Sequence, residues 1–296
     1  MSRPALAATR AVAVLNFLAA HPTESFSLSD LAARLEVNLA STHAILAALT
    51  DAGYVTRHPR LRTFTLGPSV VALGTAALEC HPVIDMARDA GRELARQTGL
   101  EVTVTAPAGD QIVFLARTGE PSAQDISALV GQHVPLVPPL GSVFVAWGGA
   151  EEWLARAEDP TSLEAVLEGV RRRGYSVGLE ARARKGLELA LHDLAGHPAD
   201  PELRGTIDTY VADLASRRYQ PAELVPNRTY QVSMIAAPIF GADGQVVLAL
   251  TLIGFPERLR GRVVEAYGEQ VRDVGLVVTK RSRGRAPTIS HRRSPA

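Results

Sequence analysis

The chain of 296 residues has almost no cysteine, since Cys80 is its only one. A single thiol excludes an internal disulfide framework and is typical of proteins in a reducing cytoplasm, where we expect this protein to act. The neighbouring His81 raises the alternative of a cysteine–histidine nucleophile. Because side chains adjacent in sequence rarely face each other, we interpret Cys80 instead as a half-buried structural thiol.

Long apolar runs are also missing. No stretch approaches the roughly 18 apolar residues of a membrane-spanning helix, so we expect no membrane partner. Residues 11–20 follow Arg3 and Arg10 and superficially resemble a signal peptide. This stretch contains Asn16, however, and its apolar residues repeat at helical spacing. An amphipathic helix is therefore the better interpretation.

The chain has no net charge, which by itself argues against a nucleic-acid partner. The charges are unevenly distributed, however. Residues 1–66 hold six arginines and four acidic residues, a balance of +2, and residues 280–296 hold six basic residues and no acid, a balance of +6. The middle of the chain must then carry −8. An acidic body between basic ends fits a protein that offers only selected surfaces to a polyanion.

Catalytic motifs are absent too. The sequence contains no nucleophile elbow, no phosphate-binding glycine loop and no His-x-x-x-His metal motif. His192 and His197 lie five residues apart beside Asp193, which is a weak metal signal in a segment interrupted by proline and glycine. We predict no enzymatic activity, no catalytic residue, no metal and no cofactor. A small-molecule-converting enzyme is the less favoured alternative.

The N-terminal region, in contrast, has a clear three-helix pattern. Residues 8–21 predict one helix, and a capping box of Ser27 and Asp30 predicts a second that ends near Leu35. Asn38 suits the start of a third helix, which Gly53 ends. Residues 54–56 and 63–66 then predict a β-hairpin. Together these elements predict a winged helix-turn-helix, although three-helix units also occur as plain structural bundles.

The remainder of the chain mixes helices with strands. Helices are expected at residues 67–78, 82–98, 141–147, from there to 173, and 257–280, and strands at 101–105, 111–115, 175–177, 231–240 and 245–253. This grouping predicts an α+β domain with an antiparallel sheet. Residues 181–226 indicate two additional helices without an assigned role.

Taken together, these segments resemble the IclR family of bacterial transcription regulators from about residue 8 to residue 280. The likeness is most specific in LEVNLASTHAILAALTDAGYVTRHPRLRTFTLGP (residues 35–68), which matches the family's helix, wing and linker without a gap. Ala236–Ile239 with Asp243-Gly244, and Val134–Leu136 leading to Gly141, provide further matches. The resemblance implies operator DNA and a small metabolite, often a carboxylic acid, as partners of a homodimer or a dimer of dimers.

The resemblance also implies a division of the chain. We expect a winged helix-turn-helix DNA-binding domain at residues 1–66 and a linker helix at 67–81. A GAF-like effector-binding domain with an antiparallel sheet follows at residues 82–280, and a basic disordered tail at 281–296. An alternative keeps the DNA binding but makes the second domain a pure oligomerisation module.

The sequence departs from the family at several positions. Leu39 and Ala44 stand in the recognition helix where the family often has cations, and Arg60-Leu61-Arg62 replaces a glycine-bearing wing tip. Met234 stands where many members have a cysteine. Residues 137–140 are apolar, and one residue shorter than the family's more polar stretch.

The third helix contains no Lys or Arg, so we expect affinity and base discrimination to come from different elements. Ser41 is expected to donate to phosphate beside unpaired N–H groups at the helix start, and His43 to bond a base edge. A solvated surface histidine is the alternative. The predicted DNA-binding residues are Arg10, Leu39, Ala40, Ser41, His43, Ala44, Arg57, His58, Arg60 and Arg62.

For the second domain, the resemblance implies a ligand pocket between the sheet and the Gly141 helix, whose start offers N–H donors to an anion. The predicted effector-binding residues are Gly141, Ser142, Phe144, Trp147, Met234, Leu252 and Ile253. Ordinary core is the competing interpretation for any one of the large side chains. Because Met234, Ile253 and residues 137–140 replace more polar residues, we predict an aromatic or aliphatic acid rather than a sugar or polar amino acid.

Overall fold

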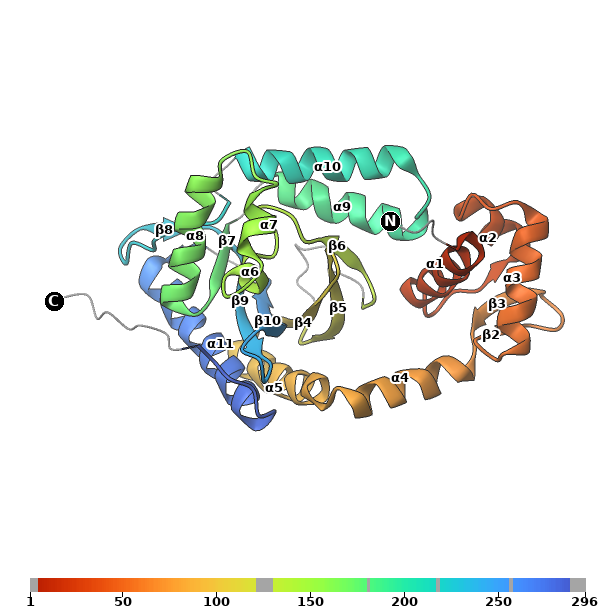
Figure 1. Cartoon of the computed structure of the whole chain (residues 1–296), viewed down its shortest axis with the longest axis horizontal. Helices are drawn as coiled ribbons and strands as arrows, with labels where there is room; N and C mark the ends of the chain where they lie inside the picture. Colours follow the sequence, from red (N-terminus) through yellow and green to blue (C-terminus); the bar gives the residue numbers. More distant parts are fainter. Residues whose placement is uncertain (1–4, 121–129, 180–181, 217–218, 256–257, 288–296) are drawn as a thin grey trace.

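The computed structural model describes residues 5–120, 130–179, 182–216, 219–255 and 258–287. Figure 1 shows a small N-terminal unit joined by the long helix α4 to a larger domain that contains the main sheet. Two helices of the larger domain, α9 and α10, extend back toward the N-terminal unit (Figure 1). The predicted α+β class with an antiparallel sheet is confirmed.

The N-terminal unit is a winged helix-turn-helix, as predicted. Its elements are α1 (Leu6–Ala20), β1 (Phe26–Ser27), α2 (Leu28–Arg34), α3 (Leu39–Asp51), β2 (Val55–Arg57) and β3 (Thr63–Leu66). The strand order is β1-β3-β2, so β1 adds a third strand to the predicted hairpin. Buried Phe17, Leu31, Leu46 and Phe64 bring the three helices and the sheet into one core.

Side-chain caps fix where the two helices of the helix-turn-helix begin. The Asp30 N–H donates to Ser27 Oγ at 3.2 Å, and the Ser27 N–H donates to Asp30 Oδ2 at 2.9 Å, which completes the predicted capping box of α2. Asn38 Oδ1 accepts from the Ser41 N–H at 2.8 Å and caps α3. Both predicted helix starts are therefore confirmed.

The linker consists of α4 (Pro68–Cys80), followed by α5 (Pro82–Thr98) at a bend of 92°. No residue of α4 is buried by the described part of the chain. Cys80 is exposed at this bend, so the interpretation as a half-buried thiol is wrong. Within the described residues no single helix is long and apolar enough to span a membrane. Only α4 and α5 taken together meet that test of length and composition.

The larger domain contains a six-stranded antiparallel sheet with the order β6-β5-β4-β10-β9-β7. Its strands are β4 (Glu101–Ala108), β5 (Gln111–Thr118), β6 (His133–Pro135), β7 (Ser176–Leu179), β9 (Val232–Phe240) and β10 (Val246–Ile253). All five predicted strands are present. A separate two-stranded sheet pairs β8 (Thr229–Tyr230) with β11 (Leu259–Arg260).

The two faces of the main sheet are covered differently, because successive side chains of a strand point to opposite faces. Val102, Val104, Leu250 and Leu252 belong to the main core, on which α5 and α11 (Gly261–Arg281) pack. Thr103, Thr105 and Thr251 alternate with them and face the opposite side, where they line a cavity.

That opposite side is covered by helices. They are α6 (Ser142–Val145), α7 (Ala150–Leu154), α8 (Pro160–Arg173), α9 (Arg182–Gly196) and α10 (Pro201–Ser216). The two helices predicted within residues 181–226 are present as α9 and α10, which pack together through Leu187, Leu191, Ile207 and Leu214. The helix predicted over residues 141–147 is shorter than expected, since α6 has four residues.

The end of the described chain is ordered where a disordered tail was expected. Arg281 is the last residue of α11, and the Arg285 N–H donates to the Gly241 carbonyl at 2.9 Å. Residues 282–287 therefore return to the turn between β9 and β10, and for them the prediction of disorder is wrong. The remainder of the predicted tail, residues 288–296, lies outside the described residues. The domain boundaries themselves stay a prediction.

Candidate DNA surface and effector cavity

The outer face of α3 is the first candidate site. Leu39, Ala40, His43 and Ala44 are exposed along it, while Thr42 and Leu46 point inward. Ser41 is half-buried, and its N–H is occupied by the Asn38 cap, so this N–H is not one of the free donors that the sequence suggested. The exposed face is small, apolar and without cations, and it can approach a flat surface closely.

The wing supplies the cations that α3 lacks. Arg57, Arg60 and Arg62 are exposed, and the Arg57 guanidinium lies 5.9 Å from the ring centroid of Phe64. His58 has a local structural role, because its side-chain Nδ1 accepts from the Leu61 backbone N–H at 3.1 Å and its backbone N–H donates to the Thr63 carbonyl at 2.7 Å. Arg10 lies half-buried on α1. The three wing arginines are thus an exposed cationic group on the hairpin that directly follows α3.

The second candidate site is a cavity of about 170 Å3 in the larger domain. It lies between the sheet, α6 and α9. Its lining residues are Thr103, Thr105, Ile112, Phe114, Gln132, Val134, Leu140, Gly141, Ser142, Val143, Phe144, Ser176, Arg184, Leu187, Glu188, Leu191, His192, Tyr219, Gln220, Met234, Ala236, Thr251 and Ile253. A volume of this size accommodates a small metabolite.

Five of the seven residues predicted for the effector line this cavity: Gly141, Ser142, Phe144, Met234 and Ile253. Trp147 and Leu252 are not among the lining residues. Trp147 packs on Phe240 with the ring centroids 5.2 Å apart. Leu252 belongs to the core on the opposite face of the sheet, next to Thr251, which does line the cavity. The alternation of side chains along β10 could have excluded Leu252 beforehand.

The cavity wall is more polar than the sequence predicted. Ser142 Oγ, Ser176 Oγ and Gln220 Oε1 are buried in residues that line the cavity and have no hydrogen-bond partner among the described residues. Thr103, Thr105 and Thr251 add hydroxyl groups from β4 and β10. The sequence suggested N–H donors at the start of the Gly141 helix as the polar group of the pocket, and these side chains add several more. That helix, α6, is a single turn and too short to act as an anion site.

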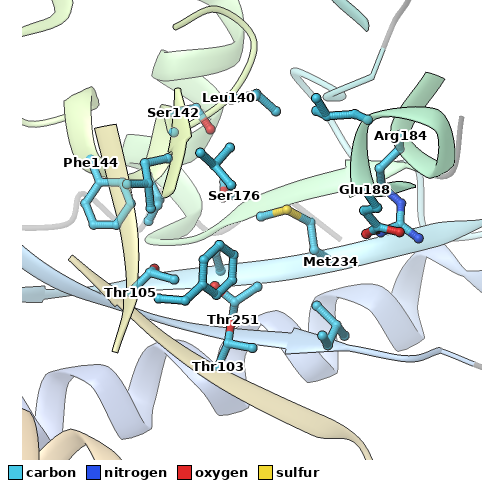
Figure 2. A pocket seen from close by; sticks show the side chains of 18 of the residues that line it. Thr103, Thr105, Leu140, Ser142, Phe144, Ser176, Arg184, Glu188, Met234 and Thr251 are labelled. Atoms are coloured by element: carbon cyan, nitrogen blue, oxygen red, sulfur yellow. Dashed lines mark hydrogen bonds and ion pairs between the residues drawn. The ribbon is translucent and has the colours of Figure 1, made fainter. Parts of the chain in front are cut away.

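Residues 181–226, the segment of additional helices that had no assigned role and is called the insertion below, provide one end of the cavity. Arg184 and Glu188 of α9 form an ion pair there, and Leu187, Leu191 and His192 of the same helix also line the wall. Figure 2 shows this pair on the opposite side of the view from Phe144, with Met234 and Thr251 between them. Arg184 is only 9% exposed, so it is a buried cation at the cavity. The sequence pattern did not indicate this role.

The described residues contain no group of three or more His, Cys, Asp or Glu side chains that could hold a metal ion. His192 and His197, considered earlier for such a site, are both exposed on or near α9. The chemistry of the cavity is therefore that of hydrogen bonds, apolar contacts and one ion pair.

Comparisons with known proteins identify relatives of this chain. Residues 7–59 match the IclR helix-turn-helix domain family. The HTH-type transcriptional regulator XynR of Escherichia coli (strain K12) is 21% identical over 273 residues, which cover 92% of this chain and 94% of XynR.

Solved structures share the fold. An IclR transcriptional regulator from Alicyclobacillus acidocaldarius has a TM-score of 0.65 at 20% identity, and the match covers 95% of this chain and 100% of that chain. An IclR homologue from Microbacterium hydrocarbonoxydans, solved in complex with 4-hydroxybenzoate, has a TM-score of 0.60 at 17% identity. This match covers 94% of this chain and 99% of that chain. Residues 7–59 thus match the IclR helix-turn-helix family, and over nearly its full length the chain is similar to a transcriptional regulator and shares its fold with IclR regulators.

Proposed function

We propose that the protein binds operator DNA through α3 and the wing, and that it responds to a small metabolite bound in the cavity. The observation that carries the proposal is the exposed face of α3 next to a wing with three exposed arginines. Transcriptional regulators of the same family, such as XynR, support it. An enzymatic role has no such support from the relatives.

On the DNA, the two elements have different tasks. The wing arginines, with Arg10, neutralise phosphates and provide affinity for any duplex. His43 and the small residues of α3 contact base edges and thymine methyl groups, which provides discrimination. The Ser41 hydroxyl, rather than its capped N–H, is the group offered to phosphate. Because His58 is held within the wing tip, its contribution is to shape the wing.

The proposed effector is a small carboxylic acid that also carries a hydrogen-bonding group. Ile112, Phe114 and Phe144 offer apolar contact to its body, and Arg184 offers a cation to its carboxylate. The buried hydroxyls of Ser142 and Ser176 offer partners to a hydroxyl or amide. The family relative bound to 4-hydroxybenzoate, a single-ring acid with a hydroxyl, contains a ligand of this class. We therefore retain the acid and withdraw the exclusion of polar ligands.

Assembly and location belong to the same proposal. Val71 and Leu73 of α4 are 72% and 59% exposed, which is unusual for large apolar side chains and supports pairing of α4 with a second copy of the chain. We propose a homodimer, or a dimer of such dimers, that acts on the chromosome in the cytoplasm. One winged unit spans a short half-site, so a symmetric pair suits a pseudo-palindromic operator.

The DNA-binding part is tested by selecting duplexes from a random pool with the full-length protein and measuring affinity at several salt concentrations. Changing Arg57, Arg60 and Arg62 together to Ala should weaken binding to every duplex. Each lost phosphate contact should reduce the log–log salt slope by about 0.9. A matched triple change of Arg88, Arg92 and Arg96 on α5 removes the same charge away from the wing and should leave the slope unchanged. Equal slopes for all three proteins contradict the proposed role of the wing.

The effector part is tested by a thermal-shift screen of the full-length protein with aromatic and aliphatic acids, including 4-hydroxybenzoate, and with their uncharged amides. At a hundred times its dissociation constant, a bound acid stabilises the folded protein by about 2.7 kcal/mol. The corresponding amide should produce a smaller shift, and Arg184→Gln should remove the difference between the two. A screen in which no acid shifts the melting temperature supports the alternative of a pure oligomerisation domain.

A further inference from the structure

One face of α9 runs along the cavity. The α9 residues that line the wall stand at positions i, i+3, i+4, i+7 and i+8, which places them on one side of the helix; they are Arg184, Leu187, Glu188, Leu191 and His192. The helix then continues beyond the cavity to Gly196. Arg184 and Gly196 are twelve residues apart, so the far end lies about 18 Å from the ion pair.

The far end of α9 is attached to the winged unit. Arg34, the last residue of α2, donates from Nη1 to the Gly196 carbonyl at 3.0 Å. The last carbonyls of a helix have no hydrogen-bond donor within the helix, and Arg34 supplies a donor to one of these carbonyls. Figure 1 shows the ends of α9 and α1 side by side, and these two helices are in contact.

Arg34 is in turn fixed to the core of the winged unit. Its guanidinium lies 5.8 Å from the ring centroid of Phe17 and 5.5 Å from that of Phe26, and both rings are buried. Because α2 packs directly on α3, a displacement of Arg34 changes the position of the helix that faces DNA. The contact between the two domains is thus made at the helix-turn-helix itself.

The insertion is also stiff enough to move as a body. The buried residues Leu187, Leu191, Ile207 and Leu214 hold α9 against α10. Gly186 lies so close to the Tyr210 ring that a Cβ at this position has no room, which brings the two helix backbones together. A shift at the cavity end of α9 is therefore transmitted along the helix instead of being absorbed by bending.

We propose that α9 couples the cavity to the winged unit. An anionic effector group competes with Glu188 for Arg184, and the helix pair α9–α10 shifts as a result. The Gly196 carbonyl then displaces Arg34, and Arg34 moves the α2–α3 unit with it. This mechanism rests on the proposed function, because it concerns regulation by the same cavity. It assigns the effector's carboxylate as the group that changes operator affinity, and it gives the insertion its role.

The coupling can be measured without an identified effector. Glu188→Gln removes the carboxylate that holds Arg184 and imitates the exchange that an acid would cause. Arg34→Met removes the donor to Gly196 and keeps apolar contact with Phe17 and Phe26. Arg204→Met is the matched control, since Arg204 also donates to a carbonyl, that of Pro198, but within the insertion. The three single variants are titrated with the operator selected by the wild-type protein. The two double variants, which combine Glu188→Gln with Arg34→Met or with Arg204→Met, are titrated in the same way.

The proposal expects Glu188→Gln to change operator affinity about five-fold or more in the wild-type and Arg204→Met backgrounds, the lower range of typical allosteric coupling. In the Arg34→Met background the change should fall below about two-fold. An unchanged affinity in Glu188→Gln overturns the proposal, and so does an equal change in all three backgrounds. Thermal melting of each variant confirms that it is folded.

Hydrogen exchange provides a second measurement that needs no DNA. Glu188→Gln should alter the exchange of the α2 amides in the full-length protein, and Arg34→Met should abolish this effect. No effect on α2 also overturns the proposal. If the wild-type protein selects no duplex at all, the proposed function fails, and the exchange measurement still decides whether α9 connects the cavity to α2.

Discussion

At the scale of single residues, the tip of the wing has an unusual backbone. Arg62 has a φ of +55°, in the left-handed region that L-residues avoid and glycine adopts freely. This conformation costs an L-residue about 1–2 kcal/mol. An arginine thus stands at a position that favours glycine, which fits its proposed role as a phosphate contact.

We expect Arg62→Gly to stabilise the protein by up to about 1 kcal/mol, because relief of the backbone outweighs the roughly 0.5–1 kcal/mol that glycine adds in chain entropy. Chemical denaturation of the full chain measures this change. The neighbouring Arg60→Gly is the matched control, and it should destabilise by about 0.5–1 kcal/mol, since Arg60 has an ordinary φ. The same Arg62→Gly protein should bind DNA more weakly. Destabilisation by Arg62→Gly would show that the arginine side chain makes a compensating contact.

The buried hydroxyl of Ser176 permits another residue-scale prediction. It lines the cavity and has no hydrogen-bond partner among the described residues. Ser176→Ala should leave the stability of the free protein unchanged or raise it, because an unpaired buried polar group is removed. Binding of an acid that bonds this hydroxyl should weaken by about 0.5–1.5 kcal/mol, measured by calorimetry.

Ser233→Ala is the control for Ser176→Ala. Ser233 Oγ is also buried without a partner among the described residues, but Ser233 is not among the residues that line the cavity. Its replacement should have a similar effect on stability and none on ligand binding. Loss of ligand binding in both variants would indicate a general effect of the substitutions on the domain.

The residue scale also shows where the sequence was and was not sufficient. Met234 and Ile253 line the cavity and are paired on adjacent strands, and their role in binding an effector stays a prediction. Leu252 does not line the cavity, because the two-residue period of a strand, and not chemical type, decides which side chain faces it. The same period assigns Thr251 to the wall. The hydroxyl groups that the strands contribute to the cavity could therefore have been predicted from the sequence.

At the scale of elements, the capping box of α2 is the clearest local determinant. Hydrogen bonds from Ser27 lower the pKa of Asp30. A carboxyl with a lowered pKa adds stability above its ordinary pKa of 3.8, and this stability is lost as the pH falls through the lowered value. The Asp30 carboxylate thus stabilises the helix-turn-helix at every pH above about 3.8, and this contribution is lost only in stronger acid.

Asp30→Ala should therefore cost about 1 kcal/mol at pH 7, the typical value for loss of a helix cap. The difference from the wild-type protein should disappear in acid, once Asp30 is protonated. Thermal denaturation over a range of pH measures both. Glu24→Ala, which removes an exposed carboxylate of the same unit outside the box, is the control and should show no such pH dependence. A constant difference at every pH contradicts the role of the Asp30 charge.

Elements with such local determinants were the predictable ones. The starts of α2 and α3 follow from Ser27, Asp30 and Asn38, and Gly53 ends the third helix as expected. By comparison, α6 is one turn where seven helical residues were expected. Its sequence is apolar and compatible with a longer helix, but the chain is needed to form the cavity wall at Gly141 and Ser142. Tertiary packing, which a local pattern does not contain, decides its length.

At the scale of the whole molecule, the connection between the domains could not be predicted. Arg34 and Gly196 are 162 positions apart, and no periodicity or motif relates them. The sequence indicated two helices in residues 181–226, which was correct, but a helical pattern does not state what its far end touches. The placement of Arg184 and Glu188 in the cavity could not be predicted either, because it also depends on contacts between distant parts of the sequence. Function at this scale follows from long-range packing.

The last prediction concerns the linker helix α4. Val71 and Leu73 are large apolar residues with 72% and 59% of their surface exposed, on a helix with no residue buried by the described part of the chain. Residues two apart lie on nearly opposite sides of a helix, so a single helix of a second copy buries one of these side chains, and burial of both needs a partner that packs around α4. Burial of a valine or leucine side chain contributes about 1.5–3 kcal/mol. Changing Val71 and Leu73 together to Glu should then raise the dimer dissociation constant at least about 100-fold, measured by analytical ultracentrifugation.

Val225→Glu is the control, because Val225 is 51% exposed but lies outside the linker, and the Val225→Glu protein should remain dimeric. The double variant should also lose its preference for a pseudo-palindromic operator and bind a single half-site as weakly as an isolated winged unit. A double variant that remains dimeric and still prefers the palindrome would exclude α4 as the contact between copies.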